Sequence, residues 1–329
     1  MLIFLLACQG KEADSLGDSL ESLPGWESIG MGLPSALLSI RGTSSTDVWT
    51  VGADMGAGPT VLHYDGSTWN SLSEPSSGDL WWVEPVGSAI YMAGEAGRII
   101  RLDPSTMSTQ EWVVDSAVTL FGLWGSDEDH LIAVGGNLSA ESGGAVAYQK
   151  VGNEWNLLDL PVEADASLAL YKVWGTGADD VWMVGSEGLL LHGDSSGLAA
   201  ASTPSNQSLY GVHGAGGVTY AVGGHSSGTI LRKDGTSWVD DSPTGAPQLN
   251  GIFARSSTEA VAVGNQGAVW IRDDAGWTED SRHDPLYYDL NATWADDQGG
   301  LWAVGGQLSS APLNEGFLLY FGTSAPPRL

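Results

Sequence analysis

The chain contains 329 residues, and its 40 acidic residues outnumber its 12 basic ones, which gives a net charge of −28 at pH 7. Because like charges repel, this balance argues against nucleic acid, and against an anionic membrane face, as electrostatic partners. Hydrophobic residues make up 42% of the chain, enough for a sizeable core, and one cysteine cannot form an internal disulfide.

An apolar N-terminal run leads directly to the cysteine, Cys8, and is too short to span a bilayer as a helix. Residues 5–8, Leu-Leu-Ala-Cys, resemble the lipobox of bacterial lipoproteins. The resemblance implies a signal over 1–8 and membrane attachment through a lipid on Cys8. Gln9 in the next position implies an outer-membrane lipoprotein of the bacterial cell envelope, facing the periplasm or the surface. The alternative is a cytosolic protein with a free thiol, because no basic region precedes the apolar run.

Residues 9–24 follow and are rich in Ser, Asp, Glu and Gly. Such a composition cannot bury enough apolar surface to fold, so we expect a flexible acidic tether. The next residues, 25–29, read Gly-Trp-Glu-Ser-Ile and predict a short strand.

A glycine-terminated strand signal then recurs along the chain, made of an apolar residue, one spacer, a small apolar residue and glycine. Its copies end at Gly52, Gly94, Gly135, Gly185, Gly223, Gly264 and Gly305. The spacings of 42, 41, 50, 38, 41 and 41 residues give a period in the forties, which indicates a repeat array.

Each repeat contains up to four short strand signals separated by Gly, Asp, Ser and Asn. A leucine-led strand such as 170–175 precedes the glycine-terminated strand, as at 180–185. A third strand and usually a tryptophan-led fourth strand follow. Four strands in each of seven units predict an all-β fold, a seven-bladed β-propeller with four antiparallel strands per blade, over 25–322. An open β-solenoid is the alternative.

The last repeat lacks a fourth strand, since its third strand at 316–321 is followed by a tail at 323–329. The spare strand signal at 25–29 has the pattern of a fourth strand. We therefore predict that this N-terminal strand completes the last blade and closes the ring, leaving no open sheet edge there. An open solenoid offers no reason for this complementarity.

Recurring tryptophans and aspartates are interpreted as structural. We expect most of the 15 tryptophans to pack between blades, including three outside the commonest slots, Trp81, Trp82 and Trp270. Aspartates precede several second strands, and we expect them to close turns by accepting backbone N–H bonds: Asp47, Asp129 and Asp180.

No motif for a metal, a cofactor or catalysis emerges. The six histidines show no zinc-protease spacing, and one cysteine cannot build a thiolate site. Glycine-rich stretches such as 214–217 join strand to strand, so no helix N-terminus is presented to an anion. We predict no metal, no cofactor and no catalytic residue.

Two segments, 65–69 and 234–238, partly resemble the Asp-box hairpin of sialidase-type propellers. Sialidase catalysis would require three converging arginines and a Tyr–Glu pair. The candidate arginines lie in no recognisable sialidase motif: Arg41, Arg98, Arg255 and Arg282. A glycan-acting hydrolase or lyase of this type is kept as the alternative function.

The Leu-x-x-Val-Trp-Gly and Asp-Val-Trp-x-Val-Gly repeats resemble those of uncharacterised bacterial lipoprotein propellers. They also resemble, distantly, the propeller of the photosystem II assembly factor. This resemblance covers residues 25–322 and implies the fold, while it implies no activity, because one fold hosts many functions.

Propellers commonly bind on the rim face formed by the loops into the innermost strand and by those between the second and third strands. The loop 279–289 combines aromatic, cationic and imidazole groups, which are frequent at binding surfaces. We expect a monomeric, non-catalytic binding or scaffold module that takes a protein or glycan partner at this rim. The predicted site residues are Arg282, His283, Tyr287, Tyr288, His225, Asn265 and Gln266.

Overall fold

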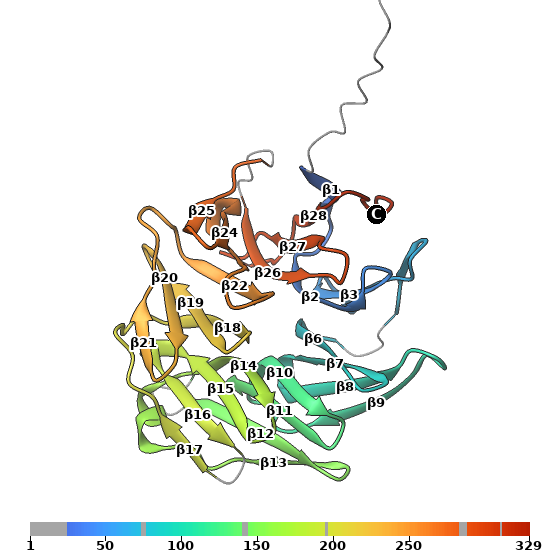
Figure 1. Cartoon of the computed structure of the whole chain (residues 1–329). Coiled ribbons are helices and arrows are strands. Elements are labelled where there is room, and N and C mark those ends of the chain that lie inside the picture. Colours follow the sequence, from blue (N-terminus) through green and yellow to red (C-terminus); the bar gives the residue numbers. More distant parts are fainter. Residues whose placement is uncertain (1–24, 74–76, 140–143, 195–196, 283–287, 310) are drawn as a thin grey trace, which may run out of the picture.

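The computed structural model describes residues 25–73, 77–139, 144–194, 197–282, 288–309 and 311–329. Within them the chain forms seven four-stranded sheets, arranged as the blades of a ring (Figure 1). In six blades the strands follow chain order from the innermost strand outward, and the last blade takes its outermost strand from the N-terminal segment. The prediction of a seven-bladed β-propeller closed by an N-terminal strand is confirmed.

In order from the innermost strand outward, blades one to four consist of β2 (Leu37–Ser44), β3 (Asp47–Asp54), β4 (Pro59–Tyr64) and β5 (Trp69–Ser71); β6 (Leu80–Val86), β7 (Ala89–Gly94), β8 (Arg98–Asp103) and β9 (Ser108–Val113); β10 (Thr119–Asp127), β11 (His130–Gly136), β12 (Ala145–Val151) and β13 (Glu154–Leu157); and β14 (Leu170–Gly177), β15 (Asp180–Gly185), β16 (Leu190–Asp194) and β17 (Gly197–Ala200). In the same order, blades five to seven consist of β18 (Leu209–Ala215), β19 (Val218–Gly224), β20 (Gly228–Asp234) and β21 (Ser237–Asp240); β22 (Leu249–Ala254), β23 (Ala260–Gly264), β24 (Val269–Asp273) and β25 (Gly276–Glu279); and β26 (Asp289–Ala295), β27 (Leu301–Gly306), β28 (Gly316–Phe321) and β1 (Trp26–Leu33).

Short 3-10 turns occupy several of the loops, and their bounds are η1 (Glu95–Gly97), η2 (Val162–Ala166), η3 (Ser186–Gly188) and η4 (Asn265–Gly267). No helix in the part of the chain that the structure describes is long and apolar enough to cross a membrane.

The glycine that marks each repeat lies at or near the end of the second strand of its blade, where the backbone passes very close to the loop entering the innermost strand. A Cβ atom at Gly52 would collide with the carbonyl oxygen of Ala36, and one at Gly264 would collide with that of Gln248. The same collision recurs at the other five repeat glycines. The sequence signal therefore records a close approach of two backbone segments that only glycine permits.

The hydrophobic core is divided among the seven interfaces between neighbouring blades. One cluster, for example, joins Tyr91 and Ile99 of blade two to Leu123 and Leu131 of blade three. Trp182 of blade four packs against Trp238 of blade five in a similar cluster. Every blade thus buries both faces of its sheet, which explains the continuous apolar runs in the second strands.

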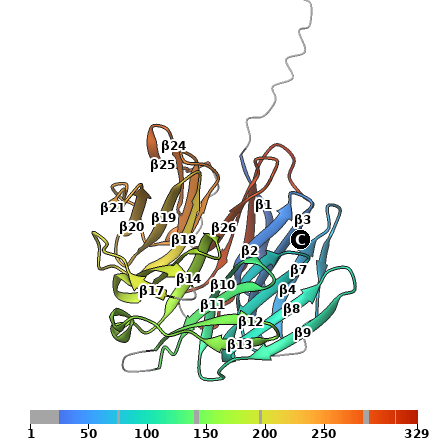
Figure 2. The same ribbon diagram turned by 60° about the horizontal axis from the view of Figure 1, so that its bottom comes forward.

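The ring closes through β1, drawn in blue beside the red β28 in Figures 1 and 2. Ile29 of β1 is fully buried, and its carbonyl oxygen accepts a 2.8 Å hydrogen bond from the backbone N–H of Leu329. The Trp26 indole N–H donates to Asp280 of the preceding blade at 3.1 Å. Strand β1 and the C-terminal residue Leu329 therefore lie against each other at the outer edge of blade seven.

Candidate functional site

The innermost strands all carry a β-bulge just after their leading leucine. The bulged residue is left out of the ladder with the second strand, and its side chain is free to point toward the ring axis. In six of the blades this residue lines one cavity at the end of the ring where the innermost strands begin: Trp81, Phe121, Tyr171, Tyr210, Asn250 and Asn291. We call this cavity the funnel.

The funnel has a volume of about 520 Å³, within the range of small-molecule sites, roughly 300–1,000 Å³. One side of it is an arc of four aromatic rings from consecutive blades. The ring centroids of Trp81 and Phe121 are 5.3 Å apart, and those of Tyr171 and Tyr210 are 5.1 Å apart. Phe121 and Tyr171 join the two pairs at 5.6 Å. Neighbouring rings support each other, so the arc presents an ordered apolar wall.

The opposite side of the funnel is built from amides that are fixed by hydrogen bonds. The buried Asn250 Nδ2 donates to Asn265 Oδ1 at 3.0 Å and to the Leu290 carbonyl at 2.9 Å. Gln248 Nε2 donates to Asn250 Oδ1 at 2.9 Å. Asn291 Nδ2 is tied to the backbone of the next blade. These amides therefore have set orientations before any ligand arrives.

A carboxylate, a hydroxyl and an imidazole complete this amide side. Asp289 is buried, and it accepts hydrogen bonds from the Gln266 backbone N–H at 3.1 Å and from Ser309 Oγ at 2.7 Å. His225 is exposed on the loop between β19 and β20 and also lines the funnel. The polar groups thus come from blades five, six and seven, opposite the aromatic arc of blades two to five.

The floor of the funnel is a layer of charged and aromatic side chains. Lys172 Nζ donates to the Phe121 carbonyl at 2.6 Å and lies 4.6 Å from the centroid of the Trp82 ring. Arg41 belongs to the same layer: its Cζ lies 4.5 Å from the centroid of the Trp82 ring, and its Nε lies 3.7 Å from Glu84 Oε2. On the far side of this layer from the funnel, a smaller cavity of about 140 Å³ is lined by Glu84, His213 and several aromatic residues.

Burial shifts the titration of these groups. It lowers the pKa of Lys172 to about 7, because an ammonium loses solvation in the channel, the narrow space between the innermost strands beneath the funnel. The charge of Arg41 acts in the same direction. Burial raises the pKa of Glu84 to about 7, against the opposing charge of Arg41. It lowers the pKa of His213 to about 3, so this ring is neutral near pH 7. The Ala254 backbone N–H donates to His213 Nδ1 at 3.0 Å, as a neutral ring allows.

The predicted site residues fall into separate places. His225 and Asn265 line the funnel, and the Gln266 backbone N–H binds Asp289 at its edge. Arg282 does not line the funnel: it forms a 2.7 Å ion pair with Asp280 and covers the Phe321 ring at 4.5 Å. Tyr288 packs against Phe317 in the core between blades six and seven. The remaining predicted residues, His283, Tyr287 and the lipidation site Cys8, lie outside the described residues.

The predicted site residues include none of the funnel-lining positions of the innermost strands. The sequence predicts a packing role for Trp81, whereas this residue forms one end of the aromatic arc. A signal existed, because aligning the repeats on their leading leucines places Trp, Phe, Tyr, Tyr, Asn and Asn in one column. The alternation of a strand alone does not reveal that this column faces the axis, since the bulge decides its direction.

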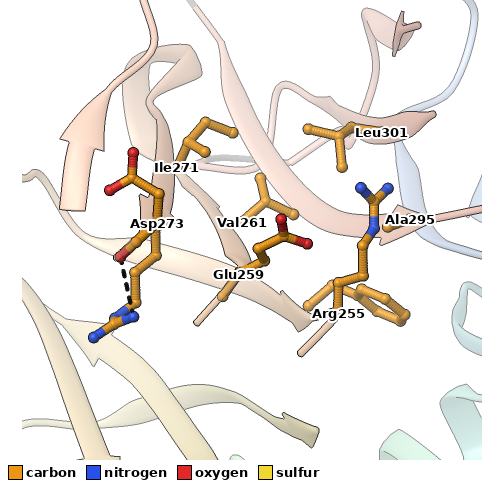
Figure 3. Close-up of a pocket in the computed structure, with 10 residues that line it drawn as sticks. Arg255, Glu259, Val261, Ile271, Asp273, Ala295 and Leu301 are labelled. Atoms are coloured by element: carbon orange, nitrogen blue, oxygen red, sulfur yellow. Dashed lines mark hydrogen bonds between the residues drawn. The ribbon is translucent and has the colours of Figure 1, made fainter. Parts of the chain in front are cut away.

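A second cleft, of about 190 Å³, opens at the opposite end of the innermost strands, between blades six and seven. Figure 3 shows a row of apolar side chains, Ile271, Val261 and Leu301, with the charged groups of Arg255 and Glu259 beside it. Arg272 also lines the cleft, and its Nη1 donates to the Asp273 carbonyl at 3.2 Å. The cleft has no amide network comparable to that of the funnel among its lining residues.

Sialidase chemistry would need several arginines to converge on one site, but the candidate arginines lie far apart in the fold. Arg41 is buried in the channel with Glu84, Arg255 borders the second cleft, and Arg282 pairs with Asp280. Arg98 is buried in blade two and donates to the Gly78 carbonyl at 2.9 Å. Among the described residues, no group of three or more His, Cys, Asp or Glu side chains could hold a metal ion.

No protein-family model matches the chain, and no curated protein matches it. Solved structures match it over most of its length. YCF48 from Cyanidioschyzon merolae is 14% identical with a TM-score of 0.67, and the match covers 90% of this chain and 98% of that one. The structure of U3-55K is 10% identical with a TM-score of 0.67, covering 90% and 98%. The WD40 β-propeller domain of Doa1 is 9% identical with a TM-score of 0.69, covering 92% and 98%. At such low identities these likenesses show the fold alone, a β-propeller.

Proposed function

We propose that the protein is a non-catalytic binding module that takes a glycan in its funnel. The observation that carries the proposal is the arc of four aromatic rings facing a fixed amide network across one cavity. A sugar ring has an apolar face of C–H groups and an edge of hydroxyls. The arc offers flat apolar surfaces to the first, and the amides offer paired donors and acceptors to the second.

The shape of the site favours a glycan over a folded protein. A protein partner commonly docks on a broad face, burying about 800 Å² per partner. The funnel is a concave space on the axis, with its polar groups already oriented, as small-ligand sites usually are. A chain end or branch of a glycan can enter such a space from one side.

Non-catalytic binding is supported by how the ionisable groups of the funnel are used. Asp289 is engaged by Gln266 and Ser309, and Glu84 lies below the floor, paired with Arg41. Neither carboxylate is placed with the other as an acid–base pair flanking the funnel. Glycoside hydrolysis ordinarily requires two such carboxylates on either side of the scissile bond.

We also propose that the module is held on the bacterial envelope through a lipid on Cys8. The lipobox-like residues 5–8 and the acidic composition of 9–24 support this arrangement. The described chain enters the ring at β1, the outermost strand of blade seven.

Binding of a glycan panel by isothermal titration calorimetry tests the function. We expect at least one oligosaccharide to bind the parent protein. Tyr171→Ala and Tyr210→Ala should each weaken that binding about tenfold or more, because aromatic anchors contribute about 2 kcal/mol. Both rings are only half buried, so thermal melting should change little.

Arg255→Ala is the matched control, since this exposed residue borders the cleft at the opposite end of the ring. It should bind as the parent does. Absence of binding across the panel, or binding that both tyrosine variants retain, would contradict the proposal. Turnover of a bound oligosaccharide would favour the hydrolase alternative. Binding of a protein that depends on Arg282 and Tyr288 would instead favour a protein-binding site on the rim.

A further inference from the structure

The floor of the funnel holds a cation that has no carboxylate partner among the described residues. Lys172 Nζ is held by the Phe121 carbonyl at 2.6 Å and by the Trp82 ring at 4.6 Å, and neither contact neutralises its charge. The nearby carboxylate, Glu84, lies 3.7 Å from Arg41 and accepts the Trp82 indole N–H at 3.1 Å. The Glu84 carboxylate is therefore paired with Arg41 and not with Lys172.

Lys172 is reachable from the funnel, because it lines both the funnel and the narrow space beneath it. The other charged group of the wall, Asp289, is turned toward Gln266 and Ser309 through hydrogen bonds of 3.1 and 2.7 Å. A ligand group that descends along the aromatic arc therefore meets an ammonium at the bottom. Arg41 lies in the same layer, but its charge is opposed by Glu84 at 3.7 Å.

We infer that the funnel is selective for acidic saccharides, whose carboxylate is bound by the ammonium of Lys172. The inference deepens the proposed glycan-binding function and rests on it. The aromatic arc would hold the sugar face, the amides of Asn250 and Asn265 its hydroxyls, and Lys172 the carboxylate of a uronic-acid residue. The remaining N–H donors of the ammonium supply charge-assisted hydrogen bonds, which are about twice as strong as neutral ones.

The energetics of the floor favour an anion there. Burial depresses the pKa of Lys172 to about 7, which means that the channel alone stabilises the ammonium poorly. A bound carboxylate supplies the missing counter-ion in a region where charges are weakly screened. A neutral sugar cannot do so. The two ligand classes should therefore differ in affinity although their ring faces are alike.

Matched pairs of oligosaccharides test this selectivity, each pair differing only in a C6 hydroxymethyl or a C6 carboxylate: gluco and glucurono, galacto and galacturono, manno and mannurono. For the pair that binds, we expect the acidic member to bind the parent about tenfold tighter or more. Lys172→Met, which keeps the length of the side chain, should abolish that preference, so that the acidic and the neutral member of the pair bind the variant with equal affinity.

The methyl ester of the acidic oligosaccharide removes the charge from the ligand instead of the protein. It should bind the parent like the neutral sugar, and this result does not depend on how Lys172→Met folds. Lys233→Met, a variant on the outer part of blade five, is the control and should keep the full preference. Equal affinity of the parent for both members of a pair would overturn this inference while leaving glycan binding intact. Failure of every sugar to bind would overturn both.

Discussion

At the scale of single residues, the recurring aspartates have a different role from the one that their position suggests. The sequence predicts that Asp47 and Asp180 close turns through backbone N–H groups. Asp47 instead accepts the Trp49 indole N–H at 3.0 Å and binds His63 at 2.8 Å, with the imidazole stacked 3.8 Å from the Trp49 ring. Blade four repeats the pairing of Asp180 with His192 at 2.7 Å.

This Asp–Trp–His arrangement joins the second and third strands of a blade. Its partners lie two and sixteen residues from Asp47, so the local pattern suggests a turn, whereas the pairing of β3 with β4 places His63 opposite Trp49. Physical contact across a ladder depends on register, which a single strand does not encode. In blade three the turn role belongs to Asp127, which accepts the backbone N–H groups of Asp129 and His130.

A pH-dependent contribution to stability is expected from His213. Its pKa in the folded state is about 3, whereas an exposed histidine titrates near 6.5. Between these values the unfolded chain binds a proton that the folded chain does not, so the free energy of unfolding falls as the pH falls from 6.5 toward 3. Because the ring is partly exposed to the lower cavity, we expect a loss of roughly 2 kcal/mol.

His213→Gln removes this titration and can still accept a hydrogen bond from Ala254. Urea unfolding at pH 7, 5 and 4 should show that the parent loses stability relative to the variant as the solution becomes acidic. Glu84 titrates in both proteins, so its effect cancels in the comparison. Parallel pH profiles for parent and variant would show that the pKa of His213 is the same in the folded and the unfolded chain.

At the scale of elements, the repeat period is sufficient to predict the blades and the closure of the ring. The glycine signal works because a backbone collision forbids any side chain at Gly52 and its six equivalents. The missing fourth strand of the last repeat and the spare strand near Trp26 are also visible without coordinates. The funnel is not predictable in this way, because its lining depends on bulges that aim side chains from distant parts of the chain at one axis.

The closing strand offers a direct test of how much the ring depends on its N-terminal segment. Ile29 is 1% exposed and packs with Leu37 and Leu318 in the cluster between blades seven and one. Ile29→Ala should lower the free energy of unfolding by roughly 2–4 kcal/mol, since it removes buried methylenes and leaves a cavity. Chemical denaturation of the purified protein gives this value.

Met31 of the same strand provides the control, because 54% of its surface is exposed. Met31→Ala should change stability by less than about 0.5 kcal/mol. If both substitutions have equally small effects, closure of the last blade by β1 contributes little to the free energy of unfolding.

At the scale of the whole molecule, the acidic surface and the funnel act on a ligand in opposite ways. A net charge of −28 keeps the protein soluble and repels polyanions at a distance, but this repulsion is screened beyond about 8–10 Å at physiological salt. Inside the funnel, the inferred site sets the Lys172 ammonium against the carboxylate of the ligand. We therefore expect short acidic oligosaccharides to bind better than long polyanionic chains, whose outer residues remain in the repulsive field.

Attachment to a membrane through Cys8 would decide how the whole ring is presented at the envelope. If Cys8 is lipidated in a bacterial envelope, the mature protein begins with that residue and partitions into the detergent phase of a phase-separation experiment. The lipid would then be joined to the ring through β1, the outermost strand of blade seven. Mass spectrometry of the protein purified from its native membrane should find a diacylglyceryl group on an N-terminal cysteine. Cys8→Ser should leave the protein in the aqueous phase or as an unprocessed precursor, with glycan binding retained. A native protein that begins with an unmodified Met1 would refute the anchor and leave the propeller and its funnel as they are.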